Sequence, residues 1–161
     1  MLMVRDLEKC DQESLSGFIG DIYKEYPSAM WFEAEPTPEA LSRLFLQKLS
    51  GMLKKDVADM VAVQDKPFGM IVGEVEIVRL AGPVGYVGII IRKEHRGKGL
   101  GSVLLEHASK KAILLGITRL RAEVASGNNA AQEFFKSRGF SLEKDEAGLQ
   151  KGILLFEKSL R

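Results

Sequence analysis

A glycine-rich turn that carries two cations, residues 96–101, holds the clearest chemistry in this sequence. It is Arg-Gly-Lys-Gly-Leu-Gly, with an apolar run at 86–91 before it and residues of helical spacing at 102–108 after it. A turn between a strand and a helix gathers unpaired backbone N–H groups and the positive end of the helix dipole at one point. The pattern therefore predicts a binding site for a ligand that carries phosphate groups.

Two widespread phosphate-binding motifs do not fit this turn. The dinucleotide fingerprint G-x-G-x-x-G requires a third glycine where Ser102 stands. The P-loop requires a Gly-Lys-Ser/Thr triplet, which follows neither Gly97 nor Gly99 at the correct spacing. A third motif, Arg or Gln followed by x-x-Gly-x-Gly/Ala between a strand and a helix, fits at Arg96, Gly99 and Gly101. Gly99 and Gly101 could also simply permit a tight bend, but two glycines beside Arg96 and Lys98 at the start of a helix favour phosphate binding.

A second block of interest covers residues 128–140, one helix and one strand downstream of the turn. Its sequence is Asn-Asn-Ala-Ala-Gln-Glu-Phe-Phe-Lys-Ser-Arg-Gly-Phe. Together the two blocks resemble the GNAT superfamily of N-acetyltransferases, whose second block is Asn-x-x-Ala-x-x-hydrophobic-Tyr-x-x-x-Gly-Phe. The resemblance implies one α/β domain over residues 1–161, with a central mixed β-sheet flanked by helices on both faces. It also implies acetyl-CoA as the cosubstrate, with its pyrophosphate at the turn, and no metal.

The cosubstrate contacts that the resemblance implies come from these blocks and from the strand before the turn. They are Ile89, Ile91, Arg96, Gly97, Lys98, Gly99, Leu100, Gly101, Ser102, Asn128, Ala131 and Phe135. In the family the strand pairs through its backbone with the pantetheine arm, and one N–H polarises the thioester carbonyl. Gly88 would permit a bulge or a close approach there. Asn128 and Gly139 also have an ordinary explanation, as the N-cap and the C-cap of a short helix.

The acid and the base of acetyl transfer are less evident than the cofactor site. An alkyl amine, with a pKa of about 10.4, is almost fully protonated at pH 7, so a proton must leave before the nitrogen attacks. Phe135 stands where the family commonly has a tyrosine acid, and Gly85 where some relatives have a glutamate base. The candidate catalytic residues are Tyr86, Glu74 and Glu76. Cross-strand packing would also explain Tyr86, a solvated strand face would explain both glutamates, and a water chain could replace all three.

The acceptor amine is expected against the N-terminal helices and the loop around Trp31. Glu33 and Glu35 in that loop, with Asp21 and Glu25 before it, would attract a cationic amine, although ordinary solubility accounts for the same charges. A small molecule, a peptide N-terminus and a lysine side chain all remain open as acceptors. The missing tyrosine hydroxyl also keeps a second function open, a non-catalytic sensor or scaffold that binds an acyl-CoA.

Hydrophobic periodicity predicts the elements that must position these residues. The first third of the chain is expected to be helical, with a short extra helix before Asp56. The expected helices cover 14–26, 37–51, 100–115 and 128–138. The expected strands cover 57–64, 69–79, 86–91, 118–124, 140 onward and 153–158. The strands at 86–91 and 118–124 should run parallel, because a helix connects them.

Composition limits the class of protein. The chain has 161 residues, 45% of them hydrophobic and 28% charged, with a net charge of +1. This is the profile of one soluble domain with no preference for nucleic acid or membrane. The single cysteine, Cys10, predicts no intrachain disulfide and no metal cluster. The first six residues are too short and too charged for a signal peptide, and no apolar run reaches the roughly 20 residues of a membrane span. A cytoplasmic enzyme is expected, and a homodimer stays open.

Overall fold

The computed structural model describes residues 1–27, 32, 34–65, 69–143 and 152–160. The strands are β1 (Leu2–Asp6), β2 (Val57–Gln64), β3 (Met70–Ala81), β4 (Val84–Ile91), β5 (Arg119–Ala125), β6 (Ser141–Leu142) and β7 (Ile153–Ser159). The helices are α1 (Gln12–Glu25), α2 (Pro38–Leu53), α3 (Leu100–Leu114) and α4 (Asn129–Ser137), with short 3-10 turns η1 (Lys9–Asp11) and η3 (Lys93–His95). None of the helices in this part of the chain is both long and apolar enough to cross a bilayer.

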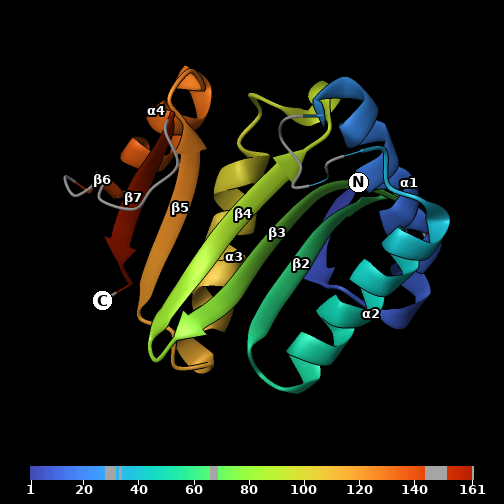
Figure 1. Cartoon of the computed structure of the whole chain (residues 1–161), viewed down its shortest axis with the longest axis horizontal. Helices are drawn as coiled ribbons and strands as arrows, with labels where there is room; N and C mark the ends of the chain where they lie inside the picture. Colours follow the sequence, from blue (N-terminus) through green and yellow to red (C-terminus); the bar gives the residue numbers. More distant parts are fainter. Residues whose placement is uncertain (28–31, 33, 66–68, 144–151, 161) are drawn as a thin grey trace.

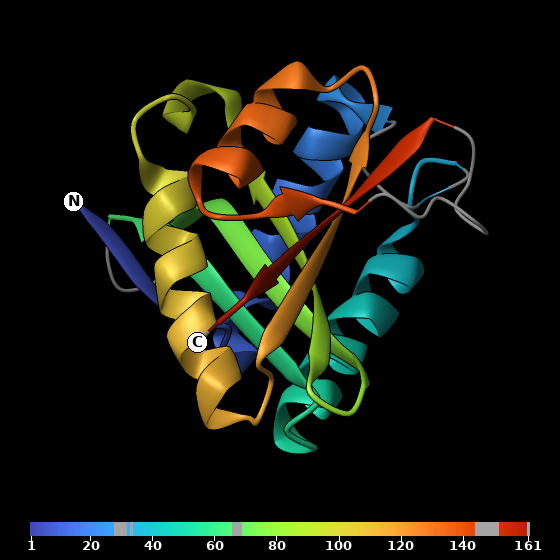
Figure 2. The same cartoon turned by 90° about the vertical axis from the view of Figure 1, so that its left-hand side faces the viewer.

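The strands form one sheet in the order β1-β2-β3-β4-β5-β7-β6. Neighbouring strands are antiparallel except β4 and β5, which run parallel as expected from the helix between them. Helix α3 packs on one face of the sheet, and α1 and α2 cover the other (Figures 1 and 2). The predicted mixed sheet with helices on both faces is therefore confirmed.

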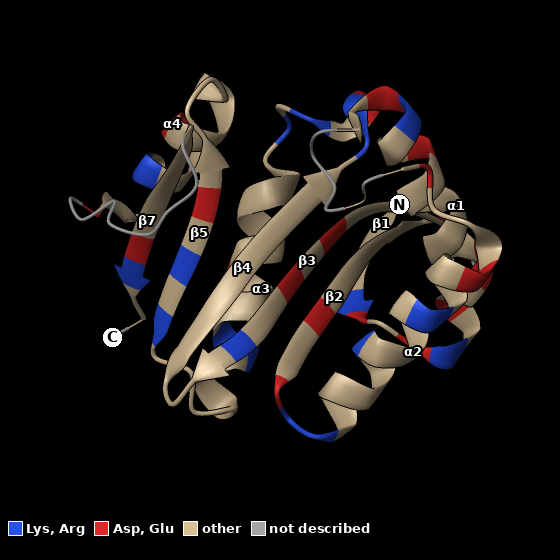
Figure 3. Ribbon diagram, viewed as in Figure 1, with Lys and Arg blue, Asp and Glu red and all other residues tan. Residues whose placement is uncertain are grey.

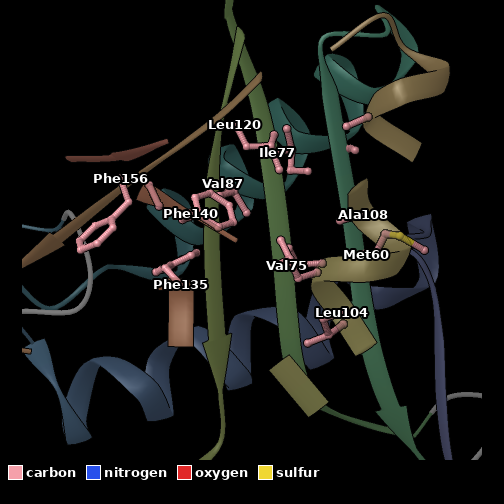
Figure 4. Close-up of a cluster of buried hydrophobic side chains, with 14 of the residues drawn as sticks. Met60, Val75, Ile77, Val87, Leu104, Ala108, Leu120, Phe135, Phe140 and Phe156 are labelled. Carbon is pink, nitrogen blue, oxygen red and sulfur yellow. The ribbon is translucent and has the colours of Figure 1, made fainter. Parts of the chain in front are cut away.

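Each face of the sheet has its own hydrophobic core. On the α3 face, side chains such as Val75, Leu104 and Phe156 are fully buried together (Figure 4). On the α1 and α2 face, Phe18 packs with Val61 and the apolar sides of both helices. Burial of one such side chain contributes about 1.5–3 kcal/mol. The two cores make the central strands a firm support for the turn that follows β4.

The sheet opens between β4 and β5. These strands are paired only from Val84 opposite Arg119 to Tyr86 opposite Arg121. Beyond that point they diverge toward the end of the sheet at which α4 lies, as Figure 1 shows. β4 remains paired with β3 up to Ile91. Its other edge, over residues 87–91, therefore presents backbone groups that have no strand partner in the described part of the chain.

The N-terminal segment differs from the prediction, because the first third of the chain is not entirely helical. Residues 2–6 form β1, which pairs along its whole length with β2 at the edge of the sheet. Five residues carry too little periodicity to specify a strand whose partner is distant in the sequence. The segment is fixed in place by Arg5, which donates two hydrogen bonds to the Asp11 carboxylate, at 2.7 and 2.8 Å.

Helix α2 begins as predicted and ends later than predicted. Thr37 caps it, its Oγ1 accepting a hydrogen bond from the Ala40 N–H at 3.1 Å. The helix continues through Gly51 to Leu53, so the short extra helix expected before Asp56 is part of α2. A left-handed residue, Lys55 with φ of 61°, then turns the chain into β2.

Candidate active site

The turn between β4 and α3 has the backbone of an anion cradle. Gly97 and Gly99 have φ of 71° and 85°, in the left-handed region that residues with a Cβ adopt only under strain. Gly99 is the N-cap of α3, and the first bond into the helix runs from the Val103 N–H to the Gly99 carbonyl, at 3.2 Å. The N–H groups of residues 100–102 therefore have no acceptor within the helix, and they lie at the positive end of its dipole. This arrangement suits phosphate oxygens.

The side chains of the first turn of α3 serve packing. Leu100 is buried in the core. A Cβ at Gly101 would lie 3.2 Å from the Phe134 ring and 3.4 Å from Ile91, so glycine lets α4 and β4 close on the start of the helix. Ser102 is half-buried. At these three predicted contact positions the polar groups available to a ligand are the backbone N–H groups and the Ser102 hydroxyl.

The two cations of the turn fold back onto the protein. Arg96 Nε donates to the Ile91 carbonyl at 2.8 Å, and its guanidinium lies over the Tyr26 ring, 4.9 Å from the centroid. Lys98 Nζ donates to the Glu94 carbonyl at 2.7 Å. Arg96 thereby fastens the turn to the end of β4 and to the end of α1, which gives it a positioning role besides its charge.

Asp21 and Glu25 of α1 are already paired with arginines. Asp21 accepts from Arg92 at 2.8 Å, and Glu25 lies 3.7 Å from Arg96. Each carboxylate is balanced by a guanidinium, so both have less free charge for a cationic amine than the sequence alone suggests. Glu35 is exposed, while Trp31 and Glu33 lie outside the described residues.

The predicted strand contacts lie on β4 where it borders the opening. Ile89 and Ile91 direct their side chains into the α3-side core, so their backbone groups are what the free edge offers. No register shift occurs at Gly88, which lies directly opposite Glu76, so β3 and β4 pair there without the bulge that glycine would permit. Gly88 is exposed, and no described atom lies within 4 Å of the place where its Cβ would stand. The strand leaves room for a close approach at this point.

The second block forms α4 and packs its aromatic residues. Asn128 is the N-cap of α4, its Oδ1 accepting from the Ala131 N–H at 3.1 Å, and Gly139 ends the helix with φ of 89°. Phe135 is only 7% exposed and makes edge-to-face contacts with Phe134 and Phe140, at 5.2 and 5.0 Å between centroids. The capping explanations of Asn128 and Gly139 are thus confirmed, and Phe135 is a core residue.

Tyr86 stands at the last paired position before the opening. Its hydroxyl donates to Glu123 Oε1 of β5 at 2.9 Å. Partial burial, the hydrogen bond to Glu123 and the charge of that carboxylate raise the pKa of Tyr86 above its ordinary value. The phenol therefore keeps its proton at neutral pH and can act as a donor. Gly85 lies on the other face, where a Cβ would come within 2.9 Å of Ile77, so a glutamate there would meet the core.

Glu74 and Glu76 belong to a cluster of charged side chains around Lys48. Lys48 Nζ lies 2.8 Å from Glu74 Oε1, 2.7 Å from Glu76 Oε2 and 3.0 Å from Asp59 Oδ2. We call these four residues the Lys48 cluster. Glu74 is 5% exposed and the Glu76 side chain 30%, so the predicted solvated strand face is wrong. Figure 3 shows the acidic segments side by side on β2 and β3, with no charged segment on β4.

Two members of the Lys48 cluster, Lys48 and Asp59, are not among the site residues predicted from the sequence. Lys48 follows Leu41, Leu44 and Phe45 on the apolar stripe of α2, and Asp59 interrupts the apolar run of β2. A charge on an apolar face is the sequence signal that could have identified them, because a buried charge requires a partner. The partner itself depends on how α2 lies across the sheet.

Removal of the Asp59 carboxylate is expected to change how stability depends on pH. Burial, followed by the charge of Glu74, raises the pKa of Asp59 well above its ordinary value. The folded chain thus binds a proton that the unfolded chain has lost, and stability falls as pH rises from about 4 through the folded pKa. Asp59→Asn cannot lose this proton, so its unfolding free energy should fall less than that of the parent protein between pH 5 and pH 8. The gap between the two proteins should therefore change by about 1 kcal/mol or more in favour of the variant.

Urea denaturation at the two pH values measures this difference, with Asp56→Asn as the control for loss of a surface carboxylate. Asp56 is 55% exposed and follows α2. An Asp59→Asn protein whose advantage is the same at pH 5 and pH 8 would contradict the assignment of a raised pKa.

Comparison with known sequences agrees with this geometry. The sequence profile of the acetyltransferase (GNAT) family matches residues 18–140, which include β4, the turn, α3 and α4. Because the match spans most of the chain, the protein belongs to that family. A search of curated protein sequences finds no match. Acetyl transfer is the general activity that family membership supports.

Solved structures share the fold over the whole chain. An acetyltransferase of the GNAT family from Streptococcus pneumoniae has 27% identity and a TM-score of 0.73, with 99% of each chain covered. YncA from Salmonella typhimurium, solved with its cofactor acetyl-CoA, has 17% identity and a TM-score of 0.79, covering 100% of this chain and 95% of that one. PaiA N-acetyltransferase from Thermoplasma acidophilum, in complex with coenzyme A, has 19% identity and a TM-score of 0.73 over 99% of each chain.

Proposed function

We propose that this protein transfers the acetyl group of acetyl-CoA to a primary amine by direct attack of the amine on the thioester. The observation that carries the proposal is the opening between β4 and β5, which begins after Tyr86 and leads to the glycine-rich turn. An extended arm laid in this opening can pair with the free edge of β4 as an added strand. A pyrophosphate at its outer end meets the unpaired N–H groups at the start of α3. Two of the fold neighbours hold acetyl-CoA or coenzyme A.

The proposed roles follow from this placement. The N–H groups of residues 97–102 bind the pyrophosphate, with Arg96 and Lys98 supplying positive charge nearby. The backbone of Ile89 and Ile91 pairs with the pantetheine arm, and an N–H of β4 near the opening polarises the thioester carbonyl. On the far side of the opening, Asn128 and Ala131 at the start of α4 border the arm, and the buried ring of Phe135 supports α4 from the core.

Tyr86 is the proposed proton donor for the leaving thiolate. The buried Phe135 has no acidic proton, whereas the Tyr86 hydroxyl stands at the closed end of the opening. A thiol has a pKa of about 8.5, so the thiolate is a fair leaving group and the donor adds a moderate effect. We expect Tyr86→Phe to lower kcat about tenfold and to leave acetyl-CoA affinity unchanged. Tyr23→Phe, on α1, is the control. Equal kcat in Tyr86→Phe and the parent protein would remove Tyr86 from the reaction.

Release of free thiol from acetyl-CoA across a set of amines tests the function. Suitable probes are spermidine, lysine amide and a peptide with a free alanine N-terminus. We expect thiol release that depends on the amine, with an N-acetylated product of matching mass. Binding of acetyl-CoA without thiol release for any amine would contradict catalysis and favour the sensor or scaffold function, which the replacement of a tyrosine by Phe135 keeps open.

A further inference from the structure

The Lys48 cluster carries more negative charge than its one ammonium balances. Three carboxylates surround Lys48 of α2, and they come from the neighbouring strands β2 and β3. Asp59 is fully buried, and its Oδ1 has no hydrogen-bond partner within the described part of the chain. Glu74 is 5% exposed, and its Oε1 lies against the Lys48 ammonium at 2.8 Å. A buried ion pair rarely stabilises a fold more than apolar residues of the same size would. Stability alone therefore gives little reason for the cluster, and its excess charge attracts a further proton or cation.

Glu76 is the member of the cluster that reaches the open side of the sheet. Its side chain is 30% exposed, against 7% for Lys48, 6% for Glu74 and none for Asp59. It lies directly opposite Gly88 on β4, and directly opposed residues of antiparallel strands have Cβ atoms about 4.5–5.5 Å apart. The space over Gly88 is empty of described atoms. A molecule that approaches β4 at this point meets the Glu76 carboxylate.

We propose that Glu76 binds the ammonium group of the acceptor and takes its proton, and that Lys48 is the residue that positions Glu76. The inference rests on the proposed acetyl transfer and adds the group that activates the amine. It assigns the base to β3, one strand away from Gly85, because the core packed around Gly85 has no room for a carboxylate.

The proton balance of the reaction fits this assignment. The ammonium R-NH3+ gives one proton to the Glu76 carboxylate, and the neutral nitrogen then attacks the thioester carbon. The C–N bond forms, the C–S bond breaks, and the electron pair of the C–S bond stays on sulfur. The second proton lost by the nitrogen goes to the thiolate, directly or through Tyr86. Glu76 afterwards releases its proton to solvent, so the sum is an amide, free CoA thiol and one proton.

The other members of the cluster set the conditions under which Glu76 acts. Lys48 Nζ lies 2.7 Å from Glu76 Oε2 and holds that carboxylate in place. Burial and the charge of Glu74 raise the pKa of Asp59, which favours the protonated form in the buried part of the cluster. The charged groups that face Glu76 are thus Lys48 of α2, Asp59 of β2 and Glu74 of β3, with the Tyr86 hydroxyl of β4 two residues from Gly88.

The test compares Glu76→Gln, Lys48→Met and Lys48→Arg with Glu106→Gln as the control, a glutamate on the exposed side of α3. For each protein the rate of thiol release is measured against pH with the best of the three amine probes, and the affinity for acetyl-CoA is measured by calorimetry. We expect Glu76→Gln to lower kcat at least a hundredfold at pH 7, in the range typical of a lost general base. Its rate should recover as pH rises and the amine loses its proton to solvent.

Acetyl-CoA affinity should stay within about twofold in Glu76→Gln, which also reports that the variant is folded. Lys48→Arg should keep a larger share of the activity than Lys48→Met, because a positioning cation can be replaced by another. A Glu76→Gln protein with the parent pH profile and a kcat within about threefold would overturn the inference while leaving acetyl transfer intact. A parent protein that binds acetyl-CoA but acetylates none of the amines would overturn the proposed function and the inference with it.

Discussion

Replacement of Gly99 by alanine should weaken acetyl-CoA binding by about ten- to a hundredfold. Gly99 has φ of 85° and is the N-cap of α3, at the point where the free N–H groups of the turn meet the helix dipole. A Cβ there strains the left-handed backbone by about 1–2 kcal/mol, and it projects into the space from which a pyrophosphate would approach. The affinity loss corresponds to about 1.4–2.7 kcal/mol, measurable by calorimetry.

Gly116→Ala is the matched control for this prediction. Gly116 has φ of 80°, close to that of Gly99, and a Cβ at either position meets no described atom within 4 Å. Gly116 lies just beyond the other end of α3. Both variants should therefore lose similar stability in urea, and only Gly99→Ala should lose affinity. Equal affinities in the two variants would show that the turn does not bind the cosubstrate.

Charge reversal at Arg96 should lower acetyl-CoA affinity about a hundredfold or more. The change removes the hydrogen bond from Arg96 Nε to the Ile91 carbonyl, and it places a carboxylate beside Glu25 and beside the expected pyrophosphate. A hydrogen bond that involves a charged group contributes about 1.5–3 kcal/mol, and like-charge repulsion adds to the loss. Calorimetry on Arg96→Glu measures the effect, which should shrink with added salt because part of it is electrostatic.

Lys93→Glu makes the same change of charge on η3, three residues upstream, at an exposed position. We expect it to cost less than about threefold in affinity. An Arg96→Glu protein that is folded and binds acetyl-CoA as tightly as Lys93→Glu would remove Arg96 from the site. Phe135→Tyr, in contrast, changes a buried ring and is expected to leave binding intact.

The sequence was a good guide to elements that carry their own local signals. Thr37 before Pro38 predicted the start of α2, and the alternation of Leu120, Ala122 and Val124 predicted β5 with its buried face. β1 escaped detection because pairing with a distant strand, and not local periodicity, makes residues 2–6 extended. Local patterns specify helices and caps, whereas edge strands depend on their neighbours.

The same distinction between local and tertiary signals applies to the residues of the candidate site. The motif at Arg96, Gly99 and Gly101 marks a turn whose conformation is local, so its role could be stated before the structure was known. The environment of Glu74 and Glu76 could not be predicted in this way. Their alternation with buried residues suggests that they face solvent, whereas in the structure Lys48 of α2 covers the same face of the sheet and contacts both. Which face a helix covers is a tertiary property.

The most direct test of the proposed acetyl-CoA site is a titration of the isotope-labelled protein with acetyl-CoA, monitored through the backbone amide resonances. We expect the largest shifts on the N–H groups of residues 97–102 at the start of α3 and of residues 87–91 along the free edge of β4. Smaller shifts are expected at the start of α4, and none on the outer side of α2. Saturation with shifts that avoid both the turn and the edge of β4 would contradict the assignment of this opening as the acetyl-CoA site.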